Sequence, residues 1–347
     1  MPLMSSCPSQ PRRAATSGAA ACLLFLTTLA AHAPVAAAAG TSPPAPAAAA
    51  LAATASAAPA SASASASGAT GASPHPVLDR IRARGYVTLA HREAAIPFSY
   101  VDGDGRPLGY ALDLCHRVVE SLRKSLNLPG LGEKYLAVTP KNRIDVIVDG
   151  RADLECGSTT NNAARREKVA FTVPHYVTGA RYAVRADSPI GTLEQFEGHT
   201  LVSTAGTTPL TAVEQANHER MLRINVVSAP DHDKAIEKVE NGQADGFVMD
   251  DVLLYGLISQ RAHPEKFKVV GKFLTIEPLA IVLSKQDPEF KHLVDTEMKR
   301  LITSGEAQGI YEHWFMQPIP PHHVALNLPM NYLLKDFWKY PSDAVPF

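Results

Sequence analysis

The sequence has almost no net charge, few cysteines and no recognisable motif for a nucleotide or a metal. It contains 33 Lys and Arg residues against 34 Asp and Glu residues, so no basic surface is available for nucleic acid or an anionic membrane. The four cysteines form no CxxC pair or Cys/His spacing typical of zinc. His218-Glu219 lacks the second histidine of a zinc-protease motif, and no glycine-rich phosphate loop is visible. We therefore expect no nucleic-acid partner, no metal and no cofactor, and any charge selectivity must be local.

The sequence also lacks an apolar run long enough to cross a bilayer comfortably. In residues 1–39, Arg12 and Arg13 precede an apolar stretch at residues 19–31, and small residues around Ala31-His32-Ala33 follow it. This order predicts an export signal that is cleaved near these alanines. A membrane anchor is the alternative, but the stretch is short and lacks a strongly basic stop.

Residues 40–75 consist almost entirely of Ala, Pro, Ser, Gly and Thr. Such a segment buries too little apolar surface to offset the entropy lost on ordering it. The composition therefore predicts a flexible tether, with the folded part beginning near Pro76.

Beyond the tether, short β-rich runs alternate with helical stretches, and 347 residues in total are enough for about two domains. The expected strands are residues 86–90, 135–138, 153–156, 200–203, 224–228, 246–249 and 279–283. The expected helices are residues 110–126, 143–149, 209–222, 231–241, 289–303 and 306–315, and Pro318, Pro320 and Pro321 end the last one. This alternation predicts parallel sheets covered by helices, and two successive sets favour two α/β lobes.

Polar clusters follow four of these strands. They are residues 91–93, residues 141–143, residues 155–162 with the nearby Arg165, and residues 203–209, which lead into a helix. Ligands of open α/β sheets lie beyond the carboxyl ends of the strands. The clusters therefore mark the expected binding site.

Hydroxyl and guanidinium groups in these clusters suit an anion. Thr204, Thr207 and Thr208 place hydroxyl donors beside backbone N–H groups at a helix N-terminus, where negative charge is favoured. Arginine offers a planar fork that matches a carboxylate. Three arginines on such loops exceed what one carboxylate needs. An α-amino group would need an acceptor, and Asp250 or Asp251 is well placed to provide it.

Each cluster also has a purely structural interpretation. A Ser/Thr-rich loop before a helix is commonly an N-cap, and a lone loop arginine is commonly a solvated surface residue. His232, between two aspartates, can simply begin a helix. What favours binding is the shared position of these residues at strand ends in both expected lobes.

From about Pro76 to Pro321 the chain resembles the amino-acid-binding family of periplasmic solute-binding proteins that serve ABC transporters, and within it the glutamate/aspartate-binding branch. The stretch Glu155-Cys-Gly-Ser-Thr-Thr-Asn-Asn162 is especially specific. The other segments that carry the resemblance are Gly-Tyr-Ala-Leu-Asp113, Pro140-Lys-Asn-Arg143, Ser228-Ala-Pro-Asp-His232, Met249-Asp-Asp251, Ser304-Gly-Glu306 and a C-terminal Pro-Ile-Pro-Pro.

The resemblance implies an α/β fold of the type II periplasmic-binding-protein class, with two lobes and two crossing hinge segments near residues 178–184 and 275–280. Lobe 1 would combine residues 76–179 with residues 280–347, and lobe 2 would comprise residues 180–279. It further implies a monomer exported to the periplasm. This monomer would capture glutamate or aspartate between its lobes and deliver it to a permease in the inner membrane.

The resemblance also implies roles for single residues. Arg165 and Thr160, with Thr204 and Thr207 from the other lobe, would hold the α-carboxylate. Ser158 and Asp250 would take the α-amino group. Arg92, Arg143 and His232 would surround the side-chain carboxylate.

Two positions depart from that branch. Pro140 stands where a serine usually joins the side-chain subsite, so one hydroxyl donor is missing. The branch can carry a second cysteine near the position of Ile281, whereas here Cys156 has Cys115 as its potential mate, and spacing leaves this pairing open.

Two other functions are compatible with the same scaffold. Related exported proteins include a dehydratase and cell-wall lytic enzymes, but catalysis needs a positioned acid or base. His91, Glu93 and His232 are the obvious candidates, and they form no recognisable pair. A sensor domain of a receptor is the third hypothesis, and the lack of any later membrane-spanning stretch argues against it.

Overall fold

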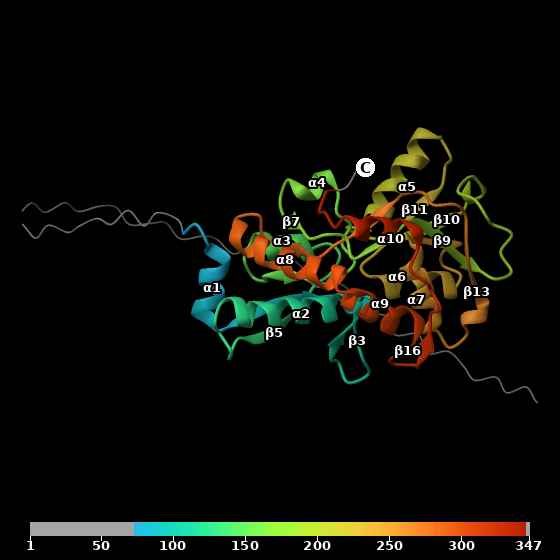
Figure 1. Ribbon diagram of the computed structural model, residues 1–347. Helices are drawn as coiled ribbons and strands as arrows, with labels where there is room; N and C mark the ends of the chain where they lie inside the picture. The colour runs from blue at the N-terminus through green and yellow to red at the C-terminus, as the bar shows by residue number, and fades with distance from the viewer. Residues whose placement is uncertain (1–72, 345–347) are drawn as a thin grey trace, which may run out of the picture. The chain divides into compact units, whose positions relative to one another are not determined.

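The computed structural model describes residues 73–344, so the expected export signal and most of the expected tether lie outside the described residues. Within this range the chain forms two five-stranded sheets and three small ones (Figure 1). No helix in the described range is long and apolar enough to cross a membrane.

The first sheet has the strand order β5-β1-β6-β15-β7. Its strands are β1 (Tyr86–His91), β5 (Gly132–Ala137), β6 (Leu154–Glu155), β7 (Ala170–Phe171) and β15 (Val282–Leu283). β5, β1 and β6 run parallel, but β15 is antiparallel to both of its neighbours. The prediction of a parallel sheet is therefore correct for β5, β1 and β6 and wrong for β15. The chain returns to this sheet only after residue 280, which is why the late strand can enter in the opposite direction.

Alternating side chains of β1 point to opposite faces, so helices can cover both faces of this sheet. Val87 and Leu89 pack in the core that holds α2 (Tyr110–Ser125) and α8 (Pro288–Thr303). Ala90 instead packs with residues of α3 (Arg143–Val148). The further helices here are α1 (Pro76–Arg84), α4 (Ala163–Arg166) and α9 (Glu306–Met316). The sheet with these helices is called lobe 1 below.

The second sheet has the strand order β11-β10-β12-β9-β13 and forms lobe 2 with its helices. Its strands are β9 (Ala180–Arg185), β10 (Thr200–Thr204), β11 (Asn225–Ala229), β12 (Gly246–Asp250) and β13 (Phe267–Val270). The helices are α5 (Thr208–Glu219), α6 (His232–Glu240) and α7 (Asp251–Ser259), with short 3-10 turns η1 (Glu194–Phe196) and η2 (Pro264–Lys266). β9 pairs antiparallel with both β12 and β13, so this sheet is also mixed.

Two short strands connect the lobes. β8 (Tyr176–Thr178) pairs antiparallel with β14 (Glu277–Leu279). The sequence predicted one strand over residues 279–283, and this prediction is wrong. The β-rich run is divided between β14 and β15, which belong to different sheets, because the chain passes from the crossing into lobe 1 at Ala280.

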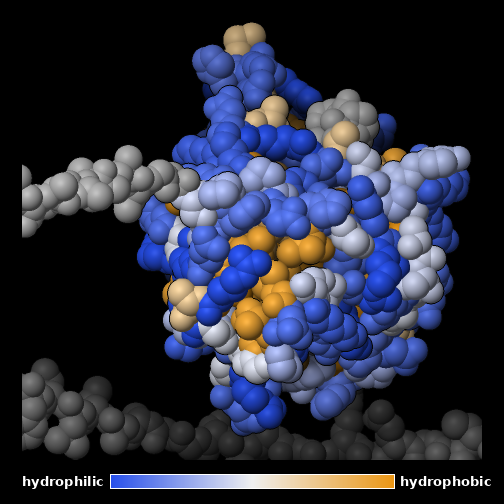
Figure 2. All heavy atoms as spheres, turned by 60° about the vertical axis from the view of Figure 1, so that its left-hand side comes forward, coloured by the Kyte–Doolittle hydropathy of each residue, from blue (hydrophilic) through white to orange (hydrophobic). Residues whose placement is uncertain are grey.

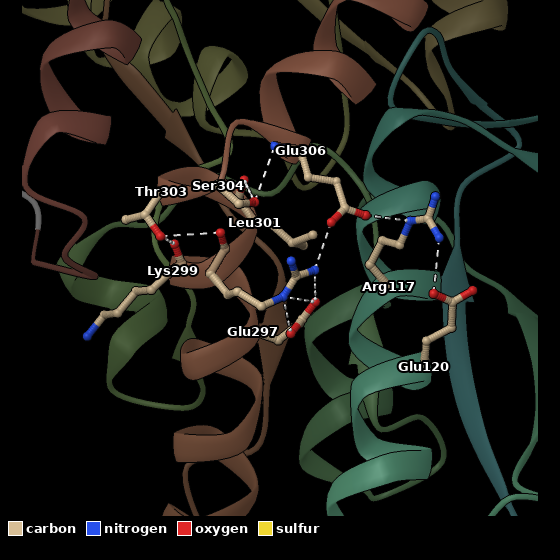
Figure 3. A network of polar contacts seen from close by, with 9 residues as sticks. Arg117, Glu120, Glu297, Lys299, Leu301, Thr303, Ser304 and Glu306 are labelled. Atoms are coloured by element: carbon tan, nitrogen blue, oxygen red, sulfur yellow. Dashed lines mark hydrogen bonds and ion pairs between the residues drawn. The ribbon is translucent and has the colours of Figure 1, made fainter.

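The segment around Ser304-Gly-Glu306 joins α8 to α9 and ties both helices to α2. Gly305 has φ +81°, a left-handed conformation that glycine adopts without strain. Glu306 accepts from Arg300 at 2.8 Å and lies 3.1 Å from the guanidinium of Arg117 on α2 (Figure 3). The motif therefore has a structural role in lobe 1.

Helix α9 is not the last helix, contrary to the sequence prediction. Beyond the prolines, β16 (Pro318–Ile319) and β17 (Val324–Ala325) form a hairpin, and α10 (Tyr332–Lys339) follows. The side-chain amide of Asn331 donates to the carbonyl of Val177 in β8 at 2.6 Å. A small sheet of β2 (Ala94–Ala95), β3 (Ser99–Val101) and β4 (Pro107–Leu108) completes the described fold.

Cys115 in α2 and Cys156 after β6 form a disulfide. The sequence left this pairing open, and the structure places the two Cα atoms 6.3 Å apart. Disulfides persist in oxidising compartments. The bond fixes the start of the loop that carries Ser158 and Thr160 to a core helix.

Hydrophilic residues dominate the face on the α1 side of the molecule and surround one hydrophobic patch (Figure 2). Large side chains such as Phe98, Tyr110, Phe247 and Phe315 are fully buried instead.

Candidate functional site

The loops that follow the strands of both lobes bring buried polar residues together. Among the nine predicted site residues, eight are less than 9% exposed and Arg165 is partly buried. Burying so many polar and charged groups is costly unless they find partners. Their mutual contacts therefore show what the site can hold.

Two arginines of lobe 1 form its positive side. Arg92 follows β1 and is 1% exposed, and Arg143 begins α3 and is 3% exposed. Burial and the neighbouring Arg143 lower the pKa of Arg92 to about 9, so its guanidinium stays charged at neutral pH. Arg92 Nη1 and Arg143 Nε have no hydrogen-bond partner among the described residues. Both side chains thus keep donors available for an anion.

Glu155 is a functional candidate to which the sequence assigned no role. This carboxylate is fully buried, and its charge acts on both Arg92 and Arg143. A Cβ on Gly157 would collide with the Glu155 carboxylate, so a larger residue there would displace this side chain. The negative charge of Glu155 therefore offsets part of the positive charge of Arg92 and Arg143.

His232 of lobe 2 lies close enough to Arg92 and Arg143 to interact with their charges. It is the first residue of α6, so the prediction that it begins a helix is confirmed. Its Nδ1 lies 2.8 Å from the hydroxyl of Thr204, and its Nε2 has no hydrogen-bond partner among the described residues. Burial, Arg92 and Arg143 hold the pKa of His232 well below its usual range. The imidazole is therefore neutral at physiological pH.

The two neighbouring aspartates at the end of β12 have different surroundings. Asp251 accepts from the hydroxyl of Thr178 at 2.7 Å, on the crossing strand β8. Asp250 is 3% exposed and lies within the fields of Arg143 and Arg165, and its Oδ1 has no hydrogen-bond partner among the described residues. Asp250 is thus the acceptor that faces the arginines.

Glu277 in crossing strand β14 is a second candidate that the sequence analysis missed. It is 2% exposed and accepts from the hydroxyl of Thr208 at 2.8 Å. Burial and the charge of Glu277 raise the pKa of Asp250 well above its ordinary value. Two carboxyl groups are thus crowded together, and a neighbouring ammonium group would favour the ionised form of Asp250.

The remaining predicted residues surround this pair. Arg165 Nη1 donates to the carbonyl of Thr160 at 2.9 Å, and burial and Arg143 lower the pKa of Arg165 to about 10. Arg143 Nη1 lies 3.5 Å from the carbonyl of Ser158. Thr207 is the N-cap residue of α5, but its hydroxyl donates to the carbonyl of Thr204 at 2.7 Å rather than capping the helix.

The arrangement suits a small ligand with two anionic groups and one cationic group. Arg92, Arg143 and Arg165 offer three positive charges, and Asp250 and Glu277 offer carboxyl groups in the same part of the site.

In the described part of the chain no group of three His, Cys, Asp or Glu side chains could hold a metal ion. Of the suggested acid–base residues, His91 hydrogen-bonds the backbone of Arg92, and burial lowers its pKa.

The two lobes and their crossing strands define a two-lobed binding-protein fold of type II. A family model described as "bacterial extracellular solute-binding proteins, family 3" matches residues 87–317. The chain belongs to this family.

Two curated relatives and one solved structure illustrate the similarity. The L-glutamate/L-aspartate-binding protein of Pseudomonas aeruginosa is 39% identical over 267 residues, which cover 77% of this chain and 88% of the relative. The glutamate/aspartate import solute-binding protein of Escherichia coli K12 is 36% identical over 266 residues, with the same coverage. An ABC uptake transporter substrate-binding protein from Streptococcus pneumoniae with bound histidine shares the fold with a TM-score of 0.62. It is 21% identical and covers 69% of this chain and 96% of its own. Both curated relatives are named as binding proteins, the one from Escherichia coli as an import protein, and this chain is a solute-binding protein rather than an enzyme.

Proposed function

We propose that this protein captures glutamate or aspartate between its two lobes and presents it to an ABC permease in the inner membrane. The observation that carries the proposal is the pair Arg92 and Arg143, buried together with guanidinium donors that have no partner among the described residues. Two such cations in one pocket suit a second carboxylate beyond the one common to all amino acids.

The roles of the other residues follow from their neighbours. Arg165, Thr160, Thr204 and Thr207 bind the α-carboxylate. Asp250 and Ser158 accept from the α-ammonium group, and the raised pKa of Asp250 supports this because an ammonium group would compensate the crowded negative charge. Neutral His232 completes the side-chain subsite with Arg92 and Arg143.

The organisation of the chain belongs to the same proposal. Residues 1–39 direct export to the periplasm and residues 40–75 form a tether. Lobe 1 comprises residues 76–179 and 280–347, and lobe 2 comprises residues 180–279. The protein acts as a monomer. Support for the division into lobes comes from the two large sheets, whose strands are divided in this way.

Calorimetric titration with glutamate, aspartate, glutamine and asparagine tests the proposal. We expect saturable binding of both acids and at least tenfold weaker binding of both amides, because a neutral amide leaves a buried guanidinium without its anion. Binding of glutamine as tight as that of glutamate would contradict the acidic specificity.

A further inference from the structure

Three polar side chains from three parts of the fold form a continuous hydrogen-bonded chain beside the site. The hydroxyl of Thr208 in lobe 2 lies 3.1 Å from the hydroxyl of Thr160 in lobe 1. The same hydroxyl donates to Glu277 Oε2 in crossing strand β14 at 2.8 Å. These residues are called the Thr160–Thr208–Glu277 relay, and they connect both lobes and the hinge.

The direction of the relay follows from the number of protons available. The hydroxyl of Thr208 has a single proton, and it donates this proton to Glu277 Oε2. The bond between the two threonines must then use the proton of Thr160. Both hydroxyl protons are therefore committed within the relay, so Thr160 would bind the ligand's α-carboxylate through its backbone N–H rather than through its hydroxyl.

Gly206 provides a second direct contact between the lobes. It has φ +78°, and a Cβ there would lie 2.8 Å from Lys141 Cα and 3.0 Å from the carbonyl oxygen of Pro140. Real Cβ atoms do not approach backbone so closely. The loop after β10 thus lies against the loop after β5, with backbone meeting backbone across the lobe interface.

We propose that Thr208 and Gly206 stabilise the closed arrangement of the lobes without contacting the amino acid, so that they set affinity for all ligands alike. The inference rests on the proposed function, because closure is the capture step. A ligand that binds only the closed form has an apparent affinity reduced by the fraction of protein that is closed. Contacts that raise this fraction increase affinity without affecting selectivity.

Removal of the Thr208 hydroxyl tests the relay. Thr208→Val keeps the shape of the side chain, Thr208→Ser keeps the hydroxyl, and Thr211→Val is the control on an exposed position of the same helix. We expect Thr208→Val to weaken glutamate, aspartate and glutamine by about the same factor, roughly tenfold. Thr208→Ser and Thr211→Val should stay within about twofold of wild type. Unchanged affinity in Thr208→Val, or a loss confined to the acidic ligands, would overturn the proposal.

Gly206→Ala tests the backbone contact, and Gly242→Ala is its matched control. Gly242 also has a left-handed φ of +70°, but nothing lies within 4 Å of a Cβ placed there. Both variants should lose similar stability, because alanine is strained at positive φ. Only Gly206→Ala should also lose affinity, by roughly tenfold or more, because its new methyl group obstructs closure. Equal affinities of the two variants would contradict the role of Gly206.

Solution scattering without any ligand separates this inference from the proposed function. We expect unliganded Thr208→Val to have a larger radius of gyration than unliganded wild type, because fewer molecules are closed. If wild type binds no acidic amino acid, the proposed function fails. The comparison of the two unliganded radii of gyration still tests whether the relay stabilises the closed arrangement. Equal radii would overturn the relay as a closing element.

Discussion

The hydroxyl of Thr204 lies 2.8 Å from Nδ1 of His232, and both residues are buried beside Arg92. The imidazole has a pKa well below its usual range because burial and two arginines disfavour the cation. Neutral His232 can donate one hydrogen bond through one ring nitrogen and accept one through the other. Its contribution to an anionic ligand is thus a hydrogen bond rather than a charge.

The first prediction is therefore that the affinity for glutamate does not fall as the pH rises from about 6.5 to 8. A histidine with a depressed pKa is already neutral throughout this window, so raising the pH removes no proton from it. Titrations at several pH values in buffers of matched ionic strength measure this. A tenfold fall in affinity from pH 6 to pH 8 would mean that His232 binds the ligand as a cation.

The second prediction concerns Arg165, whose guanidinium donates to the carbonyl of Thr160 at 2.9 Å. Arg165→Ala should weaken every amino acid by about 2–5 kcal/mol, because all share the α-carboxylate that loses its charged partner. The neighbouring Arg166 is the control. Its guanidinium donates to Asn161 at 2.6 Å, so Arg166→Ala should bind normally. Near wild-type affinity in Arg165→Ala would show that another group holds the α-carboxylate.

The third prediction concerns the disulfide, which joins residues 41 positions apart. Replacing both Cys115 and Cys156 with alanine should lower the free energy of unfolding by about 4 kcal/mol, mainly because a loop of this length is no longer closed in the unfolded chain. Urea unfolding of the variant and of oxidised wild type measures the difference. Reduced wild type is the control and should unfold like the variant. Equal midpoints for oxidised and reduced wild type would contradict the stabilising role of the bond.

The sequence pattern predicted the positions of most strands and helices because hydrophobic periodicity reports burial locally. It also located the polar clusters, since loops after strands carry the ligands of α/β sheets. It could not choose between Asp250 and Asp251, because the choice depends on how β12 ends and α7 begins. It failed at residues 279–283, where one β-rich run serves two sheets.

Glu277 shows a different kind of limit. It lies between Ile276 and Pro278 on a crossing segment, and a single carboxylate there carries no local signal of burial. Its importance follows from Thr208, which donates to it from the start of α5, far away in the sequence. Thr208 itself was predicted as a helix-terminal donor, but its partners are fixed by the approach of the lobes. Interactions that form only when two lobes meet leave no pattern within either segment.

The last prediction tests the side-chain subsite through Arg143. This guanidinium is 3% exposed and lies near Glu155 and Asp250, and its Nε has no hydrogen-bond partner among the described residues. Arg143→Met keeps most of the side-chain bulk and removes the fork. Glutamate should weaken by about 2–5 kcal/mol, because its distal carboxylate loses one of two cations. Glutamine should weaken much less, because a cation that its amide could not match has gone.

The control for Arg143→Met is Arg151→Met, which removes the same charge at an exposed position beside Asp149. It should leave both ligands within about twofold of wild type, because exposed ion pairs contribute little. Pro140 sharpens the test, since a missing serine hydroxyl leaves Arg92, Arg143 and His232 to recognise the distal group. Both ligands are titrated against the three proteins in one buffer. Equal losses for glutamate and glutamine in Arg143→Met would place Arg143 outside the distal subsite, because only a residue that contacts the distal group can distinguish a carboxylate from an amide.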